Sequence, residues 1–300
     1  MTTATYAPIP FGRLLRAELR KTTAVRAARW LLAATALLAI AAEAIPLIFT
    51  RDVSQTRGSY LMWSALGLSR LLPIVLMLAM TAEWSQRTAM TTFTLEPRRV
   101  RVLAAKVLSG LGISAAGGCF AFLTAEATVT AARAAGHHVA LAWNWPQIAG
   151  FVTFVLLTGA IGIAIGAALH NTAAAIVTYF ALAAAFSLLM IPALQQAGDW
   201  INTGQTFGWM VAGQWSGHVP QITTSAALWI ALPLAFGTVR TIRREARLRR
   251  LRRLRRIRRI QGGYRTRLTI LLSESASSAR VNGAIVLNAY VGGTLMAASV

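Results

Sequence analysis

Between Trp30 and Phe236 the sequence alternates long apolar runs with short polar loops. A transmembrane helix needs about 20 mostly apolar residues to cross a hydrocarbon core of about 30 Å. Six runs reach that length, at 30–49, 61–82, 107–130, 148–168, 172–193 and 221–238. None alternates apolar and polar residues as a barrel strand would, and a helix satisfies its own backbone groups in lipid. The pattern therefore predicts an all-α membrane protein with six transmembrane helices.

The basic residues between and beside these runs predict their orientation. They gather before the first run, after the second and after the sixth, within residues 13–29, 87–106 and 240–267. The other loops hold only Arg51, Arg57 and Arg133. Because basic loops stay on the cytoplasmic side during insertion, we expect both ends of the 30–238 core to be cytoplasmic. The expected location is the plasma membrane, with the chain crossing it several times.

The same pattern divides the chain into three parts. Residues 1–29 are expected to form a cytosolic segment with an interfacial helix, 30–238 the six-span domain, and 239–300 a basic, disordered tail. On a helical wheel, residues 11–29 place apolar side chains on one side and arginines on the other, as in a helix lying on a membrane. Glu18 falls on the apolar side. Either a protein partner or an i→i+3 contact with Lys21 would account for it.

Composition narrows the possible functions. Charged residues make up 13% of the chain and hydrophobic residues 56%, far from the roughly one-quarter charged residues of soluble domains. The net charge of +21 would suit nucleic acid, but most basic residues flank membrane runs, so anionic lipid is the expected partner and nucleic acid is not. The sequence contains no P-loop and no catalytic or metal-binding motif. We therefore predict no cofactor, no metal and no enzymatic activity in this chain.

Two charged residues and a set of glycines stand out inside the predicted spans. Counted along their helices at 1.5 Å per residue, Glu43 and Arg70 lie at similar depths near mid-membrane, where an isolated charge costs at least about 2.5 kcal/mol. We expect them to form an intramembrane ion pair. Gly159, Gly162 and Gly166 predict close helix packing, either within the chain or across a dimer.

The most specific sequence is the inner loop between the second and third runs, from Thr81 to Lys106. It resembles the permeases of ABC-2-type transporters, in which an acidic residue ends the second span and a lysine opens the third. The matching residues, in order, are Glu83, Thr88, Leu95, Pro97, Arg99 and Lys106. Residues 17–26 also resemble the interfacial helix of that family, with Glu18, Lys21 and Arg26 in register. The resemblance covers about residues 11–244; the arginine-rich tail departs from it.

The resemblance implies a permease subunit that pairs with a second permease subunit and is driven by a separate ATPase bound from the cytosol. It implies export, and the apolar spans favour a hydrophobic or amphiphilic substrate. The residues expected to couple the ATPase to the membrane helices are Glu18, Glu83, Thr88, Pro97, Arg99 and Lys106. The alternative from another class is a non-transporting membrane anchor or immunity-type protein whose basic segments recruit a partner.

Overall fold

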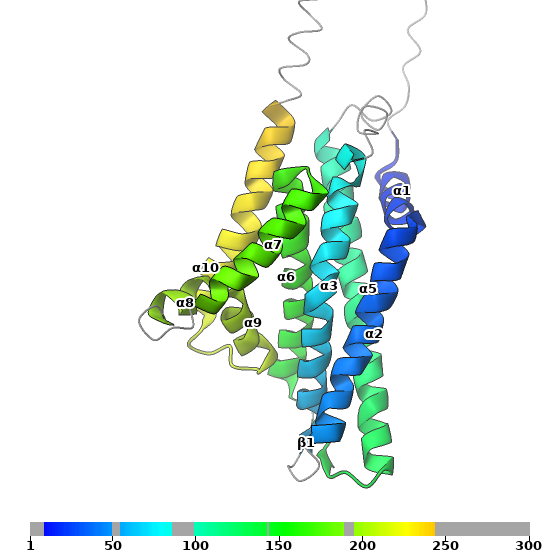
Figure 1. The fold of residues 1–300 in the computed structure, drawn as a ribbon, viewed down its shortest axis with the longest axis vertical. Helices are drawn as coiled ribbons and strands as arrows, with labels where there is room; N and C mark the ends of the chain where they lie inside the picture. The colour runs from blue at the N-terminus through cyan, green and yellow to red at the C-terminus, as the bar shows by residue number, and fades with distance from the viewer. Residues whose placement is uncertain (1–8, 50–54, 86–98, 143, 189–194, 244–300) are drawn as a thin grey trace, which may run out of the picture. The chain divides into compact units, whose positions relative to one another are not determined.

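The computed structural model describes residues 9–49, 55–85, 99–142, 144–188 and 195–243, and these are almost entirely helical. The long helices are α2 (Arg26–Phe49), α3 (Arg57–Ser85), α5 (Arg99–Ala134), α6 (Trp145–Leu169) and α7 (Thr172–Leu188). A last long helix runs from Val219 to Arg243 and includes α10 (Val219–Ala226) and the π-helical segment η2 (Ala227–Ala231). Figure 1 shows these helices side by side as a bundle.

Within the described residues, five helices are long and apolar enough to cross a membrane: α2, α3, α5 from Val100, α6 and the helix at 219–243. They contain five of the six predicted runs. The remaining predicted run, 172–193, begins with α7, whose 17 residues would span about 26 Å. Its last residues, 189–193, lie outside the described residues, as does most of the predicted tail. The chain is therefore a helical protein of the multi-pass membrane type.

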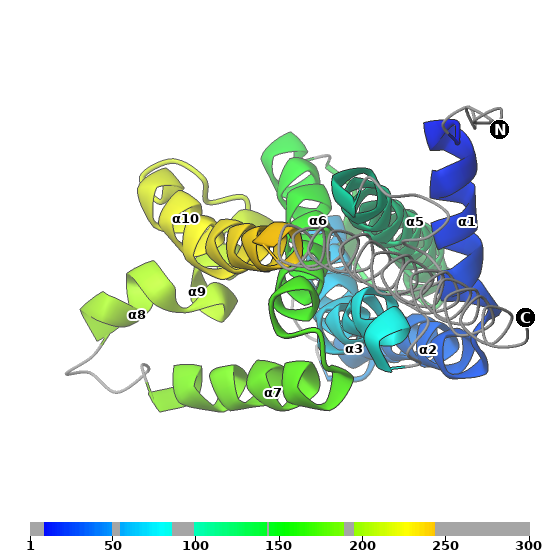
Figure 2. The same cartoon turned by 90° about the horizontal axis from the view of Figure 1, so that it is seen from above.

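The predicted amphipathic helix ends earlier than expected. Helix α1 covers Phe11–Ala24, and Val25 adopts an extended conformation, with φ −72° and ψ 126°. Residues 26–29 accordingly belong to α2. Seen along the bundle, α1 runs crosswise to the other helices, at the side of the bundle next to α5 (Figure 2). Its buried residues Leu14, Glu18 and Thr22 recur every fourth position, so this side faces protein, and Leu14 packs on Val102 and Ala105 of α5.

The centre of the bundle is the contact between α3 and α6, and glycine lets their backbones meet. A Cβ added at Gly162 would lie 2.4 Å from the carbonyl oxygen of Pro73, and one at Gly166 would lie 2.8 Å from Cβ of Met80. A Cβ at Gly159 would lie 2.0 Å from Oγ of Ser114 on α5. All three glycines thus make close contacts within this chain.

Two short helices, α8 (Gln195–Ile201) and α9 (Thr203–Val211), form the segment before the last long helix. The Trp229 indole donates a hydrogen bond to the Ile201 carbonyl (2.7 Å), and Phe207 packs on Phe154 with 6.5 Å between ring centroids. Trp229 and Phe154 lie about 14–15 Å into their helices from the residues that begin them. The segment therefore turns back partway along α6 and α10, as a re-entrant pair would. The two-residue strands β1 (Gln55–Thr56) and β2 (Val139–Ala140) pair in parallel. Because β1 lies between α2 and α3 and β2 lies between α5 and α6, this pairing joins the two connections.

Candidate functional site

Four charged side chains from three helices meet where α1 crosses the bundle. Glu18 and Lys21 come from α1, Glu83 comes from the last turn of α3, and Lys106 comes from the second turn of α5. We call these four residues the inner charge cluster. Residues 86–98, between α3 and α5, lie outside the described residues; Glu83 precedes them in the sequence and Lys106 follows them.

The lysines of the inner charge cluster bridge its carboxylates. Lys106 Nζ donates to Glu18 Oε2 at 2.7 Å and lies 3.3 Å from Glu83 Oε1. Lys21 Nζ donates to Glu18 Oε1 at 2.7 Å and to Glu83 Oε1 at 2.8 Å. Two positive and two negative charges thus alternate, and each lysine binds both glutamates. An ammonium group suits this role because it has three donors that rotate freely around one point charge.

Burial makes the cluster costly to break. The side chains of Glu18, Glu83 and Lys106 are 3%, 7% and 10% exposed, while that of Lys21 is 47% exposed. Desolvation by itself would lower the pKa of Lys21, but the hydrogen bonds and charges of Glu18 and Glu83 outweigh it and raise that pKa above 10.5. A raised lysine pKa contributes stability that is complete below the unfolded value and is lost only as the pH rises through the folded value. The Lys21 contribution is therefore fully present at neutral pH.

The sequence carries a signal for this cluster that goes beyond the family resemblance. Among 30 lysines and arginines, Lys21 and Lys106 are the only lysines, and both lie in the cluster. Of the two expectations for Glu18, the structure shows the contact with Lys21 within α1. Glu18 also binds Lys106 of α5 in the same chain. Of the other predicted coupling residues, Thr88 and Pro97 lie outside the described residues. Arg99 is the first residue of α5.

The predicted ion pair between Glu43 and Arg70 is not formed, so this prediction is wrong. Glu43 is fully buried and accepts hydrogen bonds from the hydroxyls of Thr124 (2.8 Å) and Thr128 (2.9 Å) on α5. The α2–α3 contact explains the error in depth. Gly67 lies against the backbone of Ala39, so in these antiparallel helices Glu43 is level with the region of Ser64, about 9 Å along α3 from Arg70.

Removing both threonine donors should destabilise the bundle. A hydrogen bond to a charged group contributes about 1.5–3 kcal/mol, and Thr124→Val with Thr128→Val leaves a buried carboxylate without either donor. We expect a clearly lower midpoint of thermal unfolding in detergent. Thr153→Val is the matched control, because the Thr153 hydroxyl bonds to the Ala149 carbonyl of its own helix. Equal midpoints for the double variant and the control would contradict this role for the threonines.

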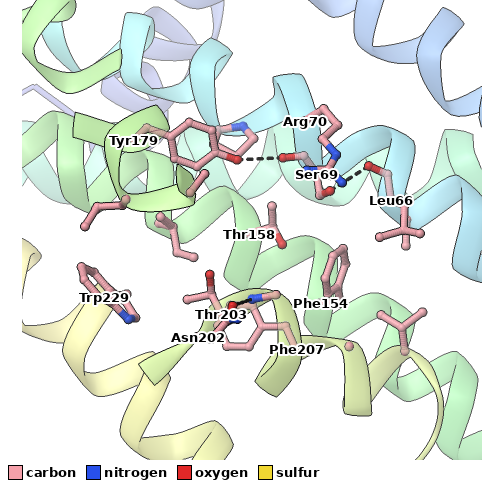
Figure 3. A pocket seen from close by; sticks show the side chains of 18 of the residues that line it. Leu66, Ser69, Arg70, Phe154, Thr158, Tyr179, Asn202, Thr203, Phe207 and Trp229 are labelled. Atoms are coloured by element: carbon pink, nitrogen blue, oxygen red, sulfur yellow. Dashed lines mark hydrogen bonds between the residues drawn. The ribbon is translucent and has the colours of Figure 1, made fainter. Parts of the chain in front are cut away.

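Arg70 instead faces a pocket of about 240 Å³ between α3, α6, α7 and α9 (Figure 3). Its walls are mainly apolar and aromatic, with polar groups from Ser69, Thr158, Asn202 and Thr203. The Tyr179 hydroxyl on one wall donates to the Ser69 carbonyl at 3.0 Å, and Trp229 of the π-helical segment lines another. Single π-helical turns inside α-helices are frequent at functional sites. Sequence reasoning located Arg70 but not the pocket, whose walls are distant in sequence.

Comparison with protein-family models, with curated proteins and with solved structures gives no match to this chain. In the described part of the chain, no three His, Cys, Asp or Glu side chains lie close enough together to hold a metal ion. The lone cysteine, Cys119, is exposed on α5.

Proposed function

We propose that the chain is the membrane-spanning permease subunit of an ATP-driven exporter of the ABC-2 type. In this proposal it crosses the plasma membrane six times with both ends of the 30–238 core in the cytosol, pairs with a second permease subunit, and is driven by a separate ATPase. The observation that carries the proposal is the inner charge cluster. Glu18, Glu83 and Lys106 lie in separate stretches of the sequence that resemble this family, and Lys106 contacts both glutamates.

The cluster supports a mechanism for coupling. An ATPase that binds on the cytosolic side would meet α1, which lies crosswise to the bundle beside the cluster (Figure 2). The cluster fastens α1 to the inner ends of α3 and α5 through buried ionic hydrogen bonds, which are stronger than neutral ones. A push on α1 would therefore move α3 and α5 together. The contact of α3 with α6 through Gly162 and Gly166 would pass the movement to the helices around the pocket.

The test is purification of the tagged full chain from its native membrane in a mild detergent. We expect an ATPase subunit with its own P-loop to purify with it, and hydrolysis by that complex to fall at least tenfold with Glu83→Lys. Arg133→Glu, which changes an exposed charge at the far end of α5, is the control and should leave hydrolysis unchanged. Recovery of the chain without any ATPase would contradict the proposal and would favour the membrane-anchor alternative.

A further inference from the structure

Arg70 lies near the middle of the long helix α3, far from both of its ends. It lies thirteen residues after the first residue of α3 and fifteen before the last, about 20 and 22 Å from the two ends. An arginine side chain is too short to reach either membrane surface from there. A charge without a partner is costly at this depth in a membrane, so a partner of opposite charge would be strongly favoured.

The described part of the chain offers Arg70 no carboxylate, because each acidic side chain there is engaged elsewhere. Glu18 and Glu83 bind the two lysines, and Glu43 accepts from two threonines. The other two acidic side chains contact other residues. Glu126 Oε1 lies 3.1 Å from Nε of Arg57, and Asp199 accepts a hydrogen bond from Gln205 at 2.8 Å. No ion pair within the described residues involves Arg70.

The pocket beside Arg70 has the composition of a site for a molecule with a charged head and an apolar body. Arg70 and Thr158 supply donors, while Phe154, Phe207 and Trp229 supply apolar surface (Figure 3). The Ser69 hydroxyl already donates to the Leu66 carbonyl at 2.7 Å. A guanidinium group matches carboxylate and phosphate in geometry and can bind either with two parallel hydrogen bonds. Small-molecule sites generally combine apolar walls with a few polar groups of this kind.

We propose that this pocket binds an anionic amphiphile, with its carboxylate or phosphate on Arg70 and its apolar chain along the aromatic walls. The inference deepens the proposed function by naming the substrate class, and it depends on that function only in treating the ligand as a substrate. A membrane lipid and an exported acid share this chemistry. The pocket volume of about 240 Å³ suits one head group with part of a single chain, so single-chain compounds are the appropriate probes.

The test uses the full chain in nanodiscs of neutral phosphatidylcholine, without any ATPase. Three photoreactive probes with the same alkyl chain are compared: a carboxylate, a phosphate monoester and a neutral alcohol. Labelling is measured against probe concentration, and labelled residues are mapped by mass spectrometry. We expect labelling in the pocket by at least one anionic probe at concentrations about 10- to 100-fold lower than for the alcohol, as hydrogen bonds to a charged group allow.

Arg70→Gln should remove the preference for the anionic probe while labelling by the alcohol remains, which shows that the pocket is still formed. Arg70→Lys should retain part of the preference, and Arg133→Gln, at an exposed site on another helix, should retain all of it. Preference for the carboxylate alone would assign the ligand to the organic acids, and preference for the phosphate alone to phospholipid-like compounds; either supports the proposal. Equal labelling by all three probes, or an unchanged preference in Arg70→Gln, would overturn it.

The two proposals fail separately. Binding is measured on the chain alone, so loss of the anion preference would leave the ATPase-coupling proposal intact. Failure of an ATPase to purify with the chain would leave the pocket's ligand assignment intact.

Discussion

Lys106→Met is expected to destabilise the protein strongly. The substitution keeps a long side chain but removes the ammonium that binds Glu18 and lies beside Glu83. Both carboxylates are nearly inaccessible to water, and removing one partner from a buried ionic cluster costs about 3–5 kcal/mol. Thermal unfolding of the purified protein in detergent should show a correspondingly large fall in midpoint.

Arg133→Met serves as the matched control for this prediction, since it removes a cation from an exposed site on the same helix, α5. Adding Glu18→Gln and Glu83→Gln to Lys106→Met should recover much of the lost stability, because no buried charge is then left unpaired. If Lys106→Met unfolds at the same midpoint as Arg133→Met, the inner charge cluster does not hold α1, α3 and α5 together.

Gly162→Ala is expected to separate the two central helices. The added Cβ would lie 2.4 Å from the Pro73 carbonyl oxygen and 2.7 Å from its Cα, and backbone atoms cannot move aside as the end of a flexible side chain can. Overpacking of this kind typically costs 1–3 kcal/mol and occasionally more. We expect a cost of about 3 kcal/mol, measured as a lower unfolding midpoint in detergent and a smaller yield of folded protein.

The control for the glycine prediction should change stability in the opposite direction. Gly112 lies on α5, and a Cβ added there meets nothing within 4 Å. Replacing glycine by alanine inside an exposed helix favours the helix by up to about 1 kcal/mol. Gly112→Ala should therefore unfold at an equal or higher temperature than the unchanged protein. A Gly162→Ala protein as stable as Gly112→Ala would contradict the close α3–α6 contact.

Features that depend on neighbouring residues in the sequence could be predicted, and features that depend on distant ones could not. The apolar runs predicted the long helices because length and hydrophobicity are local properties. The break at Val25 was missed because the wheel of residues 11–29 is continuous in amphipathicity. Depth was the weakest estimate. The pairing of Glu43 with Arg70 assumed that the start of the first run and the end of the second lie at the same level, whereas the contact of Gly67 with Ala39 offsets the two helices.

The partners of buried polar groups were equally hard to predict. The threonines that bind Glu43 lie 81 and 85 residues away in sequence, and threonine is so common in membrane helices that neither stood out. The pocket around Arg70 depends on α9 and on the π-helical turn at Trp229, neither of which has a strong sequence signature. The inner charge cluster was partly accessible, because Glu18, Glu83 and Lys106 were named from the resemblance and the two lysines are distinctive.

The most direct test of the central claim is the rate of ATP hydrolysis by the purified partner ATPase in vesicles with and without this chain. We expect the unchanged chain to raise the rate several-fold. Lys21→Met, which removes the half-exposed cation of the inner charge cluster and disturbs the fold least, should remove most of that increase. A hydrolysis rate that is the same with and without the unchanged chain would contradict a role for this protein as a permease moved by a separate ATPase.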